Sequence, residues 1–497
     1  MRAGGDGRFY ITTAIPYVNA APHIGHALEF VQTDVIARAN RLMGREVLLL
    51  TGADENSLKN VKAAEEQKIT TQQLCDRNAA YFMELAQKMN LSFGVFMRSS
   101  LREAHWPGVQ RLWQLCDGAG DIYRKKYSGL YCVGCEQFYT EGELVGGLCP
   151  EHKTKPEPVE EENYFFRLSK YQDALQKLIE EDRLRVWPQS RKNEVLGFIR
   201  GGLEDFSISR SVARARGWGV PVPGDSSQIM YVWLDALSIY MTGVGYGTSD
   251  KEFGKWWPTD VHVIGKGIIR FHAVYWPAIL LSAGIDLPKS VFVHGYLTVE
   301  GEKMSKSIGN VVSPLALLGK YTADELRYYL IRDIPTFEDG DFSEAALKDR
   351  VNKELLGDLG NLVNRVLTIV EKSGFTDFSG KNELGGMLDA DAVVGALGAM
   401  ELHNALGMIM EFVRACNRYV NDKAPWKLDG EELRGVLYNL LEAMRIVSVL
   451  MYPFIPETSE KIAGKLGTRI TGFAECRFRE SFTERTAKGE HLFKKIE

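Results

Sequence analysis

Pro22-His23-Ile24-Gly25-His26 separates two hydrophobic stretches near the start of this 497-residue chain. The stretch before it, 9–14, is apolar and β-branched and predicts a buried strand. The stretch after it, 24–43, has apolar residues at helical spacing. The histidines therefore lie where a strand passes into a helix, whose free N–H groups and dipole suit a phosphate, and Gly25 lets a flat ligand approach the backbone. The turn predicts a nucleotide site, with a structural role for the histidines as the alternative.

Composition places the chain among globular proteins. It is 45% hydrophobic and 25% charged, and its length predicts two to four domains. No apolar run approaches the about 20 residues of a membrane helix, and the N-terminus lacks a secretory apolar core, so we expect a cytoplasmic protein. Seven cysteines are too few for a disulfide framework. The net charge of −5 does not indicate a nucleic-acid partner, so any RNA binding must come from local patches.

A second buried strand is predicted over 46–52, after Gly44 as a helix C-cap. It leads into Asp54, an acid at the carboxyl end of a parallel strand, where doubly wound sheets bind ligands. Asp54 is therefore a candidate partner for a cationic group, with a helix N-cap as the alternative. Further elements are expected as helices over 57–67, 70–90 and 103–117 and a short strand near 95–97. This alternation predicts an α/β fold with a doubly wound parallel sheet.

A segment from 122 to about 225 differs from its surroundings, since it is strand-like and broken by glycines and prolines. It contains a Cys-x-x-Cys pair and a Cys-x-x-His pair separated by 13 residues, the spacing of a tetrahedral zinc site. Four unliganded side chains are the alternative. Because the pattern has no open coordination position, we expect a structural zinc rather than a catalytic one. Its ligands would be Cys132, Cys135, Cys149 and His152.

The α/β pattern returns near residue 228. A strand passes into a helix over 229–240, a buried strand follows over 261–265, a helix runs over 266–283, and another strand covers 291–295. The segment 122–225 is therefore predicted to be an insertion that splits one parallel-sheet domain.

Lys303-Met304-Ser305-Lys306-Ser307 follows the last of these strands. Two lysines three residues apart, in a loop flanked by glycines, can hold a triphosphate as charge develops. A solvated surface charge run is the alternative.

The chain is predicted to be almost wholly helical from about 345 onward, with an amphipathic face that favours an antiparallel bundle. Trp426, beside the helix-breaking Pro425, is either a core anchor or an exposed stacking platform. In the charged tail from 481, Leu492 and Phe493 are expected to dock back onto the bundle.

The pair of motifs Pro22–His26 and Lys303–Ser307 resembles the two signatures of class I aminoacyl-tRNA synthetases. Neighbouring residues resemble the methionyl-tRNA synthetase family, in its bacterial form with a single zinc knuckle, and the likeness extends from residue 8 to about 480. These residues are Ile15-Pro16-Tyr17-Val18-Asn19, Thr51-Gly52-Ala53-Asp54-Glu55, Tyr231-Val232-Trp233-Leu234-Asp235-Ala236, and Asn417-Arg418-Tyr419 through Trp426.

The resemblance implies a Rossmann-like catalytic domain split by a small zinc-containing insertion and followed by a helical anticodon-binding domain. The implied divisions are a first catalytic half over 1–117, a connective insertion over 118–226 with its zinc knuckle at 132–152, a second catalytic half over 227–320, a linking segment over 321–348, an anticodon-binding bundle over 349–480 and a tail over 481–497. The chain ends after the bundle, so a monomer is expected.

The resemblance also implies a reaction. Methionine and ATP would form methionyl-adenylate and pyrophosphate, and the methionyl group would pass to the 3′-terminal adenosine of tRNA(Met), including the initiator. His23 and His26 would contact the triphosphate, Lys303 and Lys306 would hold the departing pyrophosphate, and Mg²⁺ would accompany ATP. The implied nucleotide-binding residues are His23, Gly25, His26, Lys266, Gly295, Lys303 and Lys306.

The implied methionine pocket is rich in aromatic side chains, which suit a polarizable thioether. Asp54 would pair with the α-ammonium group, and the other implied pocket residues are Ile15, Tyr17, Trp233, Ala236, Leu237, Tyr240, Ile268 and His272. Trp426 would stack on an anticodon base, with Asn417 and Arg418 as neighbouring contacts.

Several positions depart from the family pattern. Asn56-Ser57 stands where the family has His-Gly, and Gly267 stands where the family has Asp in the ATP site. Thr368 and Lys372 appear where some members have an anticodon-reading Asn and Arg. The alternatives to an active ligase are a catalytically weakened tRNA-binding relative and a small-molecule nucleotidylyltransferase. The helical C-terminal part with Trp426 argues against the latter.

Overall fold

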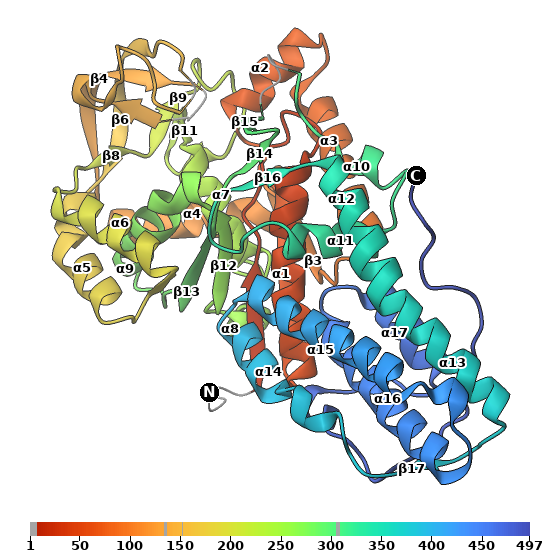
Figure 1. Cartoon of the computed structure of the whole chain (residues 1–497). Coiled ribbons are helices and arrows are strands. Elements are labelled where there is room, and N and C mark those ends of the chain that lie inside the picture. The colour runs from red at the N-terminus through yellow and green to blue at the C-terminus, as the bar shows by residue number, and fades with distance from the viewer. Residues whose placement is uncertain (1–6, 134–136, 152, 305–308) are drawn as a thin grey trace.

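A six-stranded parallel sheet forms the centre of the chain in the computed structural model, which describes residues 7–133, 137–151, 153–304 and 309–497 (Figure 1). Neighbouring strands run in the order β3-β2-β1-β12-β13-β7, and every pair is parallel. From β1 the first half of the chain adds β2 and β3 toward one edge of the sheet, and the second half adds β12 and β13 toward the other edge. The topological switch point therefore lies between β1 and β12. In sheet order the strands are Val95–Arg98, Glu46–Ala53, Arg8–Thr12, Val261–Gly265, Ser290–His294 and Arg185–Trp187.

The two faces of the sheet pack into different cores, because successive side chains on a strand point to opposite sides. On β1, Phe9 and Ile11 belong to one cluster and Tyr10 to the other. Helices α1 (Ile24–Leu42) and α3 (Thr71–Lys88) contribute to the first cluster. The second cluster contains side chains of α4 (Arg102–Gly118), α7 (Val232–Thr242) and α9 (Trp276–Ala283). The predicted doubly wound fold is confirmed.

The local predictions around the histidine turn are also confirmed. Helix α1 begins at Ile24, within the turn and directly after His23, and Gly44 follows its end with a φ of +85°. The helices predicted over 57–67 and 70–90 are α2 (Leu58–Glu66) and α3, and α8 (Asp250–Trp256) lies between α7 and β12. Before α9 the chain forms a 3₁₀ turn over Lys266–Ile268 and a π-helical turn over Phe271–Tyr275. Pro277, which cannot donate a backbone hydrogen bond, accounts for the widened turn.

The segment 122–225 contains more helix than its strand-like texture predicts. Helices α5 (Gln172–Glu180) and α6 (Gln189–Arg200) lie in it, and β7 between them completes the edge of the central sheet. Helix α5 buries Leu175, Leu178 and Ile179 on one side, a pattern too short to stand out in the sequence. Its strands form two antiparallel sheets, β5-β4-β6-β8 and β10-β11-β9. These strands are β4 (Ile122–Cys132), β5 (Gln137–Tyr139), β6 (Glu157–Phe166), β8 (Phe206–Ser207), β9 (Ser209–Ser211), β10 (Pro221–Val222) and β11 (Asp225–Met230).

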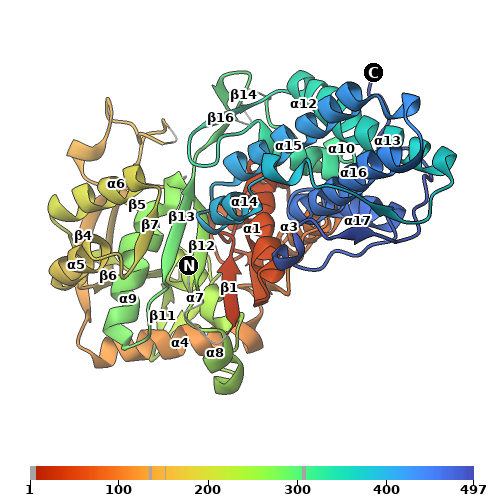
Figure 2. The same cartoon turned by 60° about the horizontal axis from the view of Figure 1, so that its bottom comes forward.

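A small sheet and a helical bundle follow the second half of the central sheet. The small sheet has the order β15-β14-β16, from Glu302–Lys303, Leu297–Val299 and Gly340–Phe342. The insertion and the bundle lie at opposite ends of the molecule, with α1 between the central sheet and the bundle (Figures 1 and 2). The remaining helices are α10 (Pro314–Leu317), α11 (Ala323–Arg332), α12 (Glu344–Arg350), α13 (Asn361–Ser373), α14 (Ala390–Gly398), α15 (Leu402–Lys423), α16 (Gly430–Met451) and α17 (Pro456–Lys465), with a π-helical stretch over Val351–Gly360.

A buried ion pair joins α1 to the bundle. The Asp34 carboxylate lies 2.8 Å from Arg327 and 2.7 Å from Arg38, and the Arg327 guanidinium donates to the carbonyls of Phe454 and Pro453. Burial alone would raise the pKa of Asp34, but the two guanidinium groups lower it to about 2. The charged pair therefore ties the helix that carries the histidines to the C-terminal part of the chain.

The tail docks as predicted. Phe493 is buried in the main core and Leu492 packs against it, while Asn352 and Ile496 exchange two hydrogen bonds of 2.8 and 2.9 Å. At the start of the tail, the short strand β18 (Ser481–Phe482) pairs with β17 (Phe378–Ser379). Among the described helices, none is both long and apolar enough to cross a membrane.

Candidate functional site

A cavity of about 990 Å³ opens at the carboxyl ends of the central strands, at the switch point between β1 and β12. Doubly wound sheets bind ligands at this place. The predicted site residues that line it are Ile15, Tyr17, His23, His26, Trp233, Lys266 and Ile268. The lining does not include the predicted residues Gly25, Asp54, Ala236, Leu237, Tyr240, His272 and Gly295. Lys306 and the side chain of Lys303 lie outside the described residues.

The two histidines are locked into the start of α1. His23 is the N-cap, and its Nδ1 accepts a hydrogen bond from the backbone N–H of Gly25 at 3.2 Å. The Nδ1 atom of His26 accepts from the backbone N–H of His23 at 3.1 Å, and the rings stack with centroids 3.8 Å apart. Since Nδ1 is an acceptor in both rings, each neutral ring carries its proton on Nε2. The turn therefore presents two imidazole N–H donors at a helix N-terminus.

Both rings are held in the neutral state. Burial lowers the pKa of His23 to about 4, and burial together with the His23 ring lowers the pKa of His26 well below its usual range. Attraction to an anion at this turn therefore comes from hydrogen bonds and the helix dipole rather than from imidazolium charge.

A second pair of neutral histidines lies behind the cavity. Burial lowers the pKa of His272 to about 4 and that of His262 well below its usual range. His272 donates from Nδ1 to the Ile268 carbonyl at 3.0 Å and accepts at Nε2 from the Tyr240 hydroxyl at 2.8 Å. Tyr240 and His272 are thus buried partners, joined by a hydrogen bond that the neutral imidazole accepts.

The free energy of unfolding should fall as the pH drops from about 6.5 toward 4. In this window an unfolded histidine, with a pKa near 6.5, binds a proton that the folded chain excludes, so acid favours unfolding. We expect His272→Gln to reduce this dependence by up to one proton, about 1.4 kcal/mol per pH unit. Denaturant unfolding at several pH values measures the slope. An unchanged slope would contradict the assignment, and His491→Gln, in the tail, is the matched control.

Glu29 spans the switch point, and sequence reasoning missed it. One carboxylate oxygen accepts from the backbone N–H of Ala14 at 2.9 Å, after β1, and the other lies 3.0 Å from Nε2 of His294, at the end of β13. The sequence could have indicated Glu29, because it lies three residues after His26 and residues three apart share a helix face. Glu29 fixes the spacing of the strand ends that form the cavity.

The opposite wall of the cavity is aromatic. The Trp233 ring stacks on Phe271 with centroids 3.7 Å apart and meets Tyr17 edge to face at 6.2 Å. Tyr17 also lies under the ammonium group of Lys59, 4.0 Å from its ring centroid. Lys59, Phe271 and Glu29 are lining residues that the sequence did not single out.

Asp54 lies beside this wall at the end of β2. Its backbone pairs with Tyr17, donating to the Pro16 carbonyl at 2.8 Å, and the residue is only 2% exposed. The N-cap alternative for Asp54 is wrong, because Ser57 caps α2 by accepting from the Lys59 N–H at 3.0 Å. Ser57 therefore has a structural role as a helix cap. Asn56 has one too, because its side-chain amide donates to the Ser99 carbonyl at 3.0 Å.

At two glycines predicted to contact the nucleotide, other atoms of the protein fill the space where a β-carbon would lie. A β-carbon at Gly25 would lie 3.0 Å from the His23 ring, and one at Gly295 would lie 2.1 Å from the Glu338 carbonyl oxygen. Gly25 therefore makes room for the His23 ring, and Gly295 lets the segment around Glu338 cross the end of β13. Lys266 lines the cavity with its ammonium group 2.7 Å from the Asp339 carboxylate.

Two of the four predicted zinc ligands lie within the described residues. Cys132 and Cys149 are each 1% exposed and share one small apolar cluster. The Cys132 thiol lies 3.9 Å from the Thr154 hydroxyl, and the Cys149 thiol lies 3.6 Å from the Tyr139 hydroxyl. Two buried thiols in one cluster fit a zinc knuckle. Cys135 and His152 lie outside the described residues.

Trp426 is exposed, so the core-anchor alternative is wrong. It lies in a 3₁₀ turn after α15 with 55% of its surface accessible, and the Arg365 guanidinium is 5.7 Å from its ring centroid. Arg418 is also exposed. The Asn417 amide nitrogen instead donates to the Asp358 and Val413 carbonyls at 3.0 and 3.3 Å.

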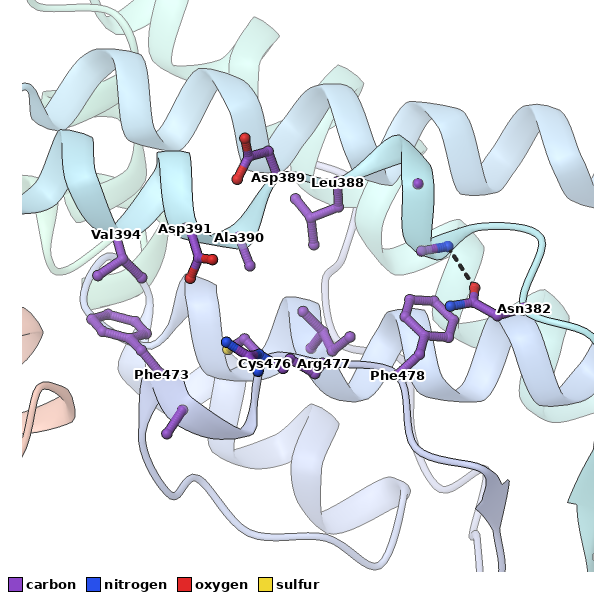
Figure 3. Close-up of a pocket in the computed structure, with 14 residues that line it drawn as sticks. Asn382, Leu388, Asp389, Ala390, Asp391, Val394, Phe473, Cys476, Arg477 and Phe478 are labelled. Carbon is purple, nitrogen blue, oxygen red and sulfur yellow. Dashed lines mark hydrogen bonds between the residues drawn. The ribbon is translucent and has the colours of Figure 1, made fainter.

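A second cavity, of about 540 Å³, lies in the bundle between the start of α14 and the segment around Phe473 (Figure 3). Its lining contains Asp389 and Asp391 on one side and Cys476 and Arg477 on the other. Asp389 accepts from the Ala392 N–H at 2.9 Å as the cap of α14. This cavity includes none of the predicted site residues.

Known proteins resemble this chain in sequence and in structure. The family described as "tRNA synthetases class I (M)" matches residues 9–157 and 152–367. A methionine–tRNA ligase from Brucella suis is 43% identical over 92% of this chain and 91% of its own length. One from Thermotoga maritima is 41% identical over 99% of this chain and 80% of its own length. The solved structure of Mycobacterium tuberculosis methionyl-tRNA synthetase with methionyl-adenylate superposes with a TM-score of 0.92 at 40% identity, covering 98% of this chain and 99% of the other.

Proposed function

The chain belongs to the methionyl-tRNA synthetases of class I, and we infer that methionine and ATP react in the cavity at its switch point. The enzyme joins the methionine carboxylate to the α-phosphate of ATP, which gives methionyl-adenylate and pyrophosphate. It then transfers the methionyl group to the 3′-terminal adenosine of tRNA(Met), including the initiator. We place this reaction in the cytoplasm.

The observation that carries the assignment is the histidine turn. It offers two neutral N–H donors and a helix N-terminus at the carboxyl ends of the sheet. Displacement at the α-phosphate needs alignment and charge stabilisation more than a strong base. His23 and His26 therefore hold the phosphate oxygens near the reacting phosphorus. Lys303 and Lys306 hold the departing pyrophosphate, and Mg²⁺ bound with ATP would neutralise part of its phosphate charge.

The aromatic wall receives the methionine side chain. Trp233 and Tyr17 offer ring faces and edges to the thioether, and each such contact contributes about 0.3–1.5 kcal/mol. Asp54, next to Tyr17, pairs with the α-ammonium group. Ala236, Leu237, Tyr240 and His272 support the wall from behind. In this pocket, a difference of one methylene between amino-acid side chains is worth about 1–3 kcal/mol of discrimination.

Methionine-dependent exchange of radioactivity between pyrophosphate and ATP tests the proposed function. We expect exchange with methionine and much less with leucine or cysteine at equal concentration. Absent exchange, or equal exchange with all three amino acids, would overturn it. Exchange without charging of tRNA(Met) would indicate a weakened relative instead.

A structural zinc ion is proposed for the insertion, held by Cys132, Cys135, Cys149 and His152. Elemental analysis of the freshly purified chain should find about one zinc per chain, because the four-ligand knuckle is a closed structural site. Cys132→Ser should lower this value well below one. Cys116→Ser is the matched control, since Cys116 is buried elsewhere and donates to the Ile279 carbonyl. Absence of zinc from the unsubstituted chain would contradict the assignment.

Trp426 is proposed to stack on an anticodon base, with Arg418 and Asn417 beside it. Trp426→Ala should lower kcat/KM for charging tRNA(Met) by about 5–150-fold, which corresponds to a base stack of about 1–3 kcal/mol. Methionine-dependent exchange should stay unchanged, because it needs no tRNA. Met387→Ala, also at an exposed apolar residue of the bundle, is the control. Equal loss of charging and exchange would make Trp426 structural.

A further inference from the structure

A tyrosine hydroxyl fills the space above Gly267. Gly267 lies in the turn after β12 and Tyr296 lies two residues after β13, so the two meet at the same edge of the central sheet. A β-carbon built at Gly267 would lie 2.3 Å from the Tyr296 hydroxyl oxygen and 3.3 Å from the ring carbon that bears it. Both residues line the large cavity. Any side chain at residue 267 would therefore have to displace the hydroxyl.

Tyr296 is held in place by the Lys266–Asp339 ion pair. Its backbone N–H donates to the Asp339 carboxylate at 2.8 Å, and the same carboxylate accepts from the Lys266 ammonium at 2.7 and 2.8 Å. That ammonium also lies 4.5 Å from the Tyr296 ring centroid. Backbone and ring are thus fixed by one ion pair, so the hydroxyl has a defined position in the cavity wall.

The part of the cavity wall that contains Tyr296 differs in chemistry from the histidine turn and from the aromatic wall around Trp233. The histidine turn suits phosphates, and the Trp233 wall suits an apolar side chain. The edge formed by β12 and β13 presents a neutral hydroxyl, which donates one hydrogen bond and accepts others, as a sugar hydroxyl also does. We propose that the Tyr296 hydroxyl binds a ribose hydroxyl of ATP, and that Gly267 is needed because it leaves room for this contact. The inference rests on the proposed function and adds a nucleotide-positioning residue to it.

The test compares ATP with its 2′-deoxy and 3′-deoxy analogues in methionine-dependent exchange. Tyr296→Phe should lower kcat/KM for ATP about tenfold, since a ligand hydroxyl loses its partner, and leave the KM for methionine unchanged. For the analogue that lacks the contacted hydroxyl, the same substitution should change kcat/KM less than twofold. No loss with ATP, or an equal loss with ATP and both analogues, would overturn the proposal.

A double substitution tests the role of Gly267. Gly267→Ala should also lower kcat/KM for ATP about tenfold, because the new methyl group displaces the hydroxyl, and it should cost less than a further twofold in the Tyr296→Phe chain. If the two substitutions lowered kcat/KM for ATP independently, so that their factors multiplied in the double variant, the proposed link between Gly267 and Tyr296 would be overturned. Thermal unfolding of each variant should match that of the unsubstituted chain. If the unsubstituted chain itself shows no exchange with ATP, the proposed function fails and this inference with it. If the chain is active but nucleotide discrimination is unaltered in Tyr296→Phe, only this inference fails.

Discussion

Replacing His23 by Asn is expected to lower methionine-dependent exchange by about 10²–10³-fold, the usual cost of removing one preorganised donor to developing charge. The effect should appear in kcat, because the proposed role of the Nε2–H donor is to hold the phosphate as it becomes the reacting centre. Asn is chosen because its side-chain oxygen is among the best N-caps and can accept from the N–H groups that begin α1. Exchange assays at varied ATP, with thermal unfolding of the same samples, provide the measurement.

The matched comparison separates chemistry from folding. His23→Leu removes both the donor and the cap, so it should lose activity and also stability, by about 0.5–2 kcal/mol. His491→Asn, at an exposed histidine of the tail, should lose neither. If His23→Asn retained full kcat, the histidine turn would be a structural cap and the alternative given by the sequence would stand.

The sequence predicted the parts of the site that depend on local order. The strand, the turn and the helix around His23 are set by hydrophobic spacing and by a cap, and both are readable over 20 residues. The same holds for β12 and β13, whose apolar runs lie directly before the turn that contains Gly267 and the one that contains Tyr296.

Long-range pairings could not be predicted in this way. Strand β7 has three residues and lies inside a segment of different texture, so only its pairing with β13 reveals that it belongs to the central sheet. The buried Asp34 on α1 finds its partner Arg327 nearly 300 residues later, and a charge in an apolar helix face signals only that some partner exists. The collision between a β-carbon at Gly267 and the Tyr296 hydroxyl is likewise a property of two strand ends brought together by the sheet.

Asp54→Asn is expected to lower kcat/KM for methionine by about 10²–10³-fold. Asp54 is 2% exposed, and loss of one member of a buried charge pair costs about 2–5 kcal/mol, because the other charge is left without its partner. In the proposed site the remaining charge is the α-ammonium group of methionine. Asn has nearly the same shape, so the backbone pairing of residue 54 with Tyr17 should persist and the thermal unfolding should change little.

Two competitive inhibitors locate the lost interaction. Methioninol keeps the ammonium group and lacks the carboxylate, so Asp54→Asn should weaken its inhibition of exchange by a similar factor. The analogue 4-(methylthio)butyrate lacks the ammonium group, so its inhibition should be unchanged. Asp250→Asn is the control, because the Asp250 side chain is 86% exposed. Equal weakening of both inhibitors would mean that Asp54 shapes the aromatic wall through Tyr17 rather than binding the ammonium group, since a distorted wall would reject the thioether that both molecules share.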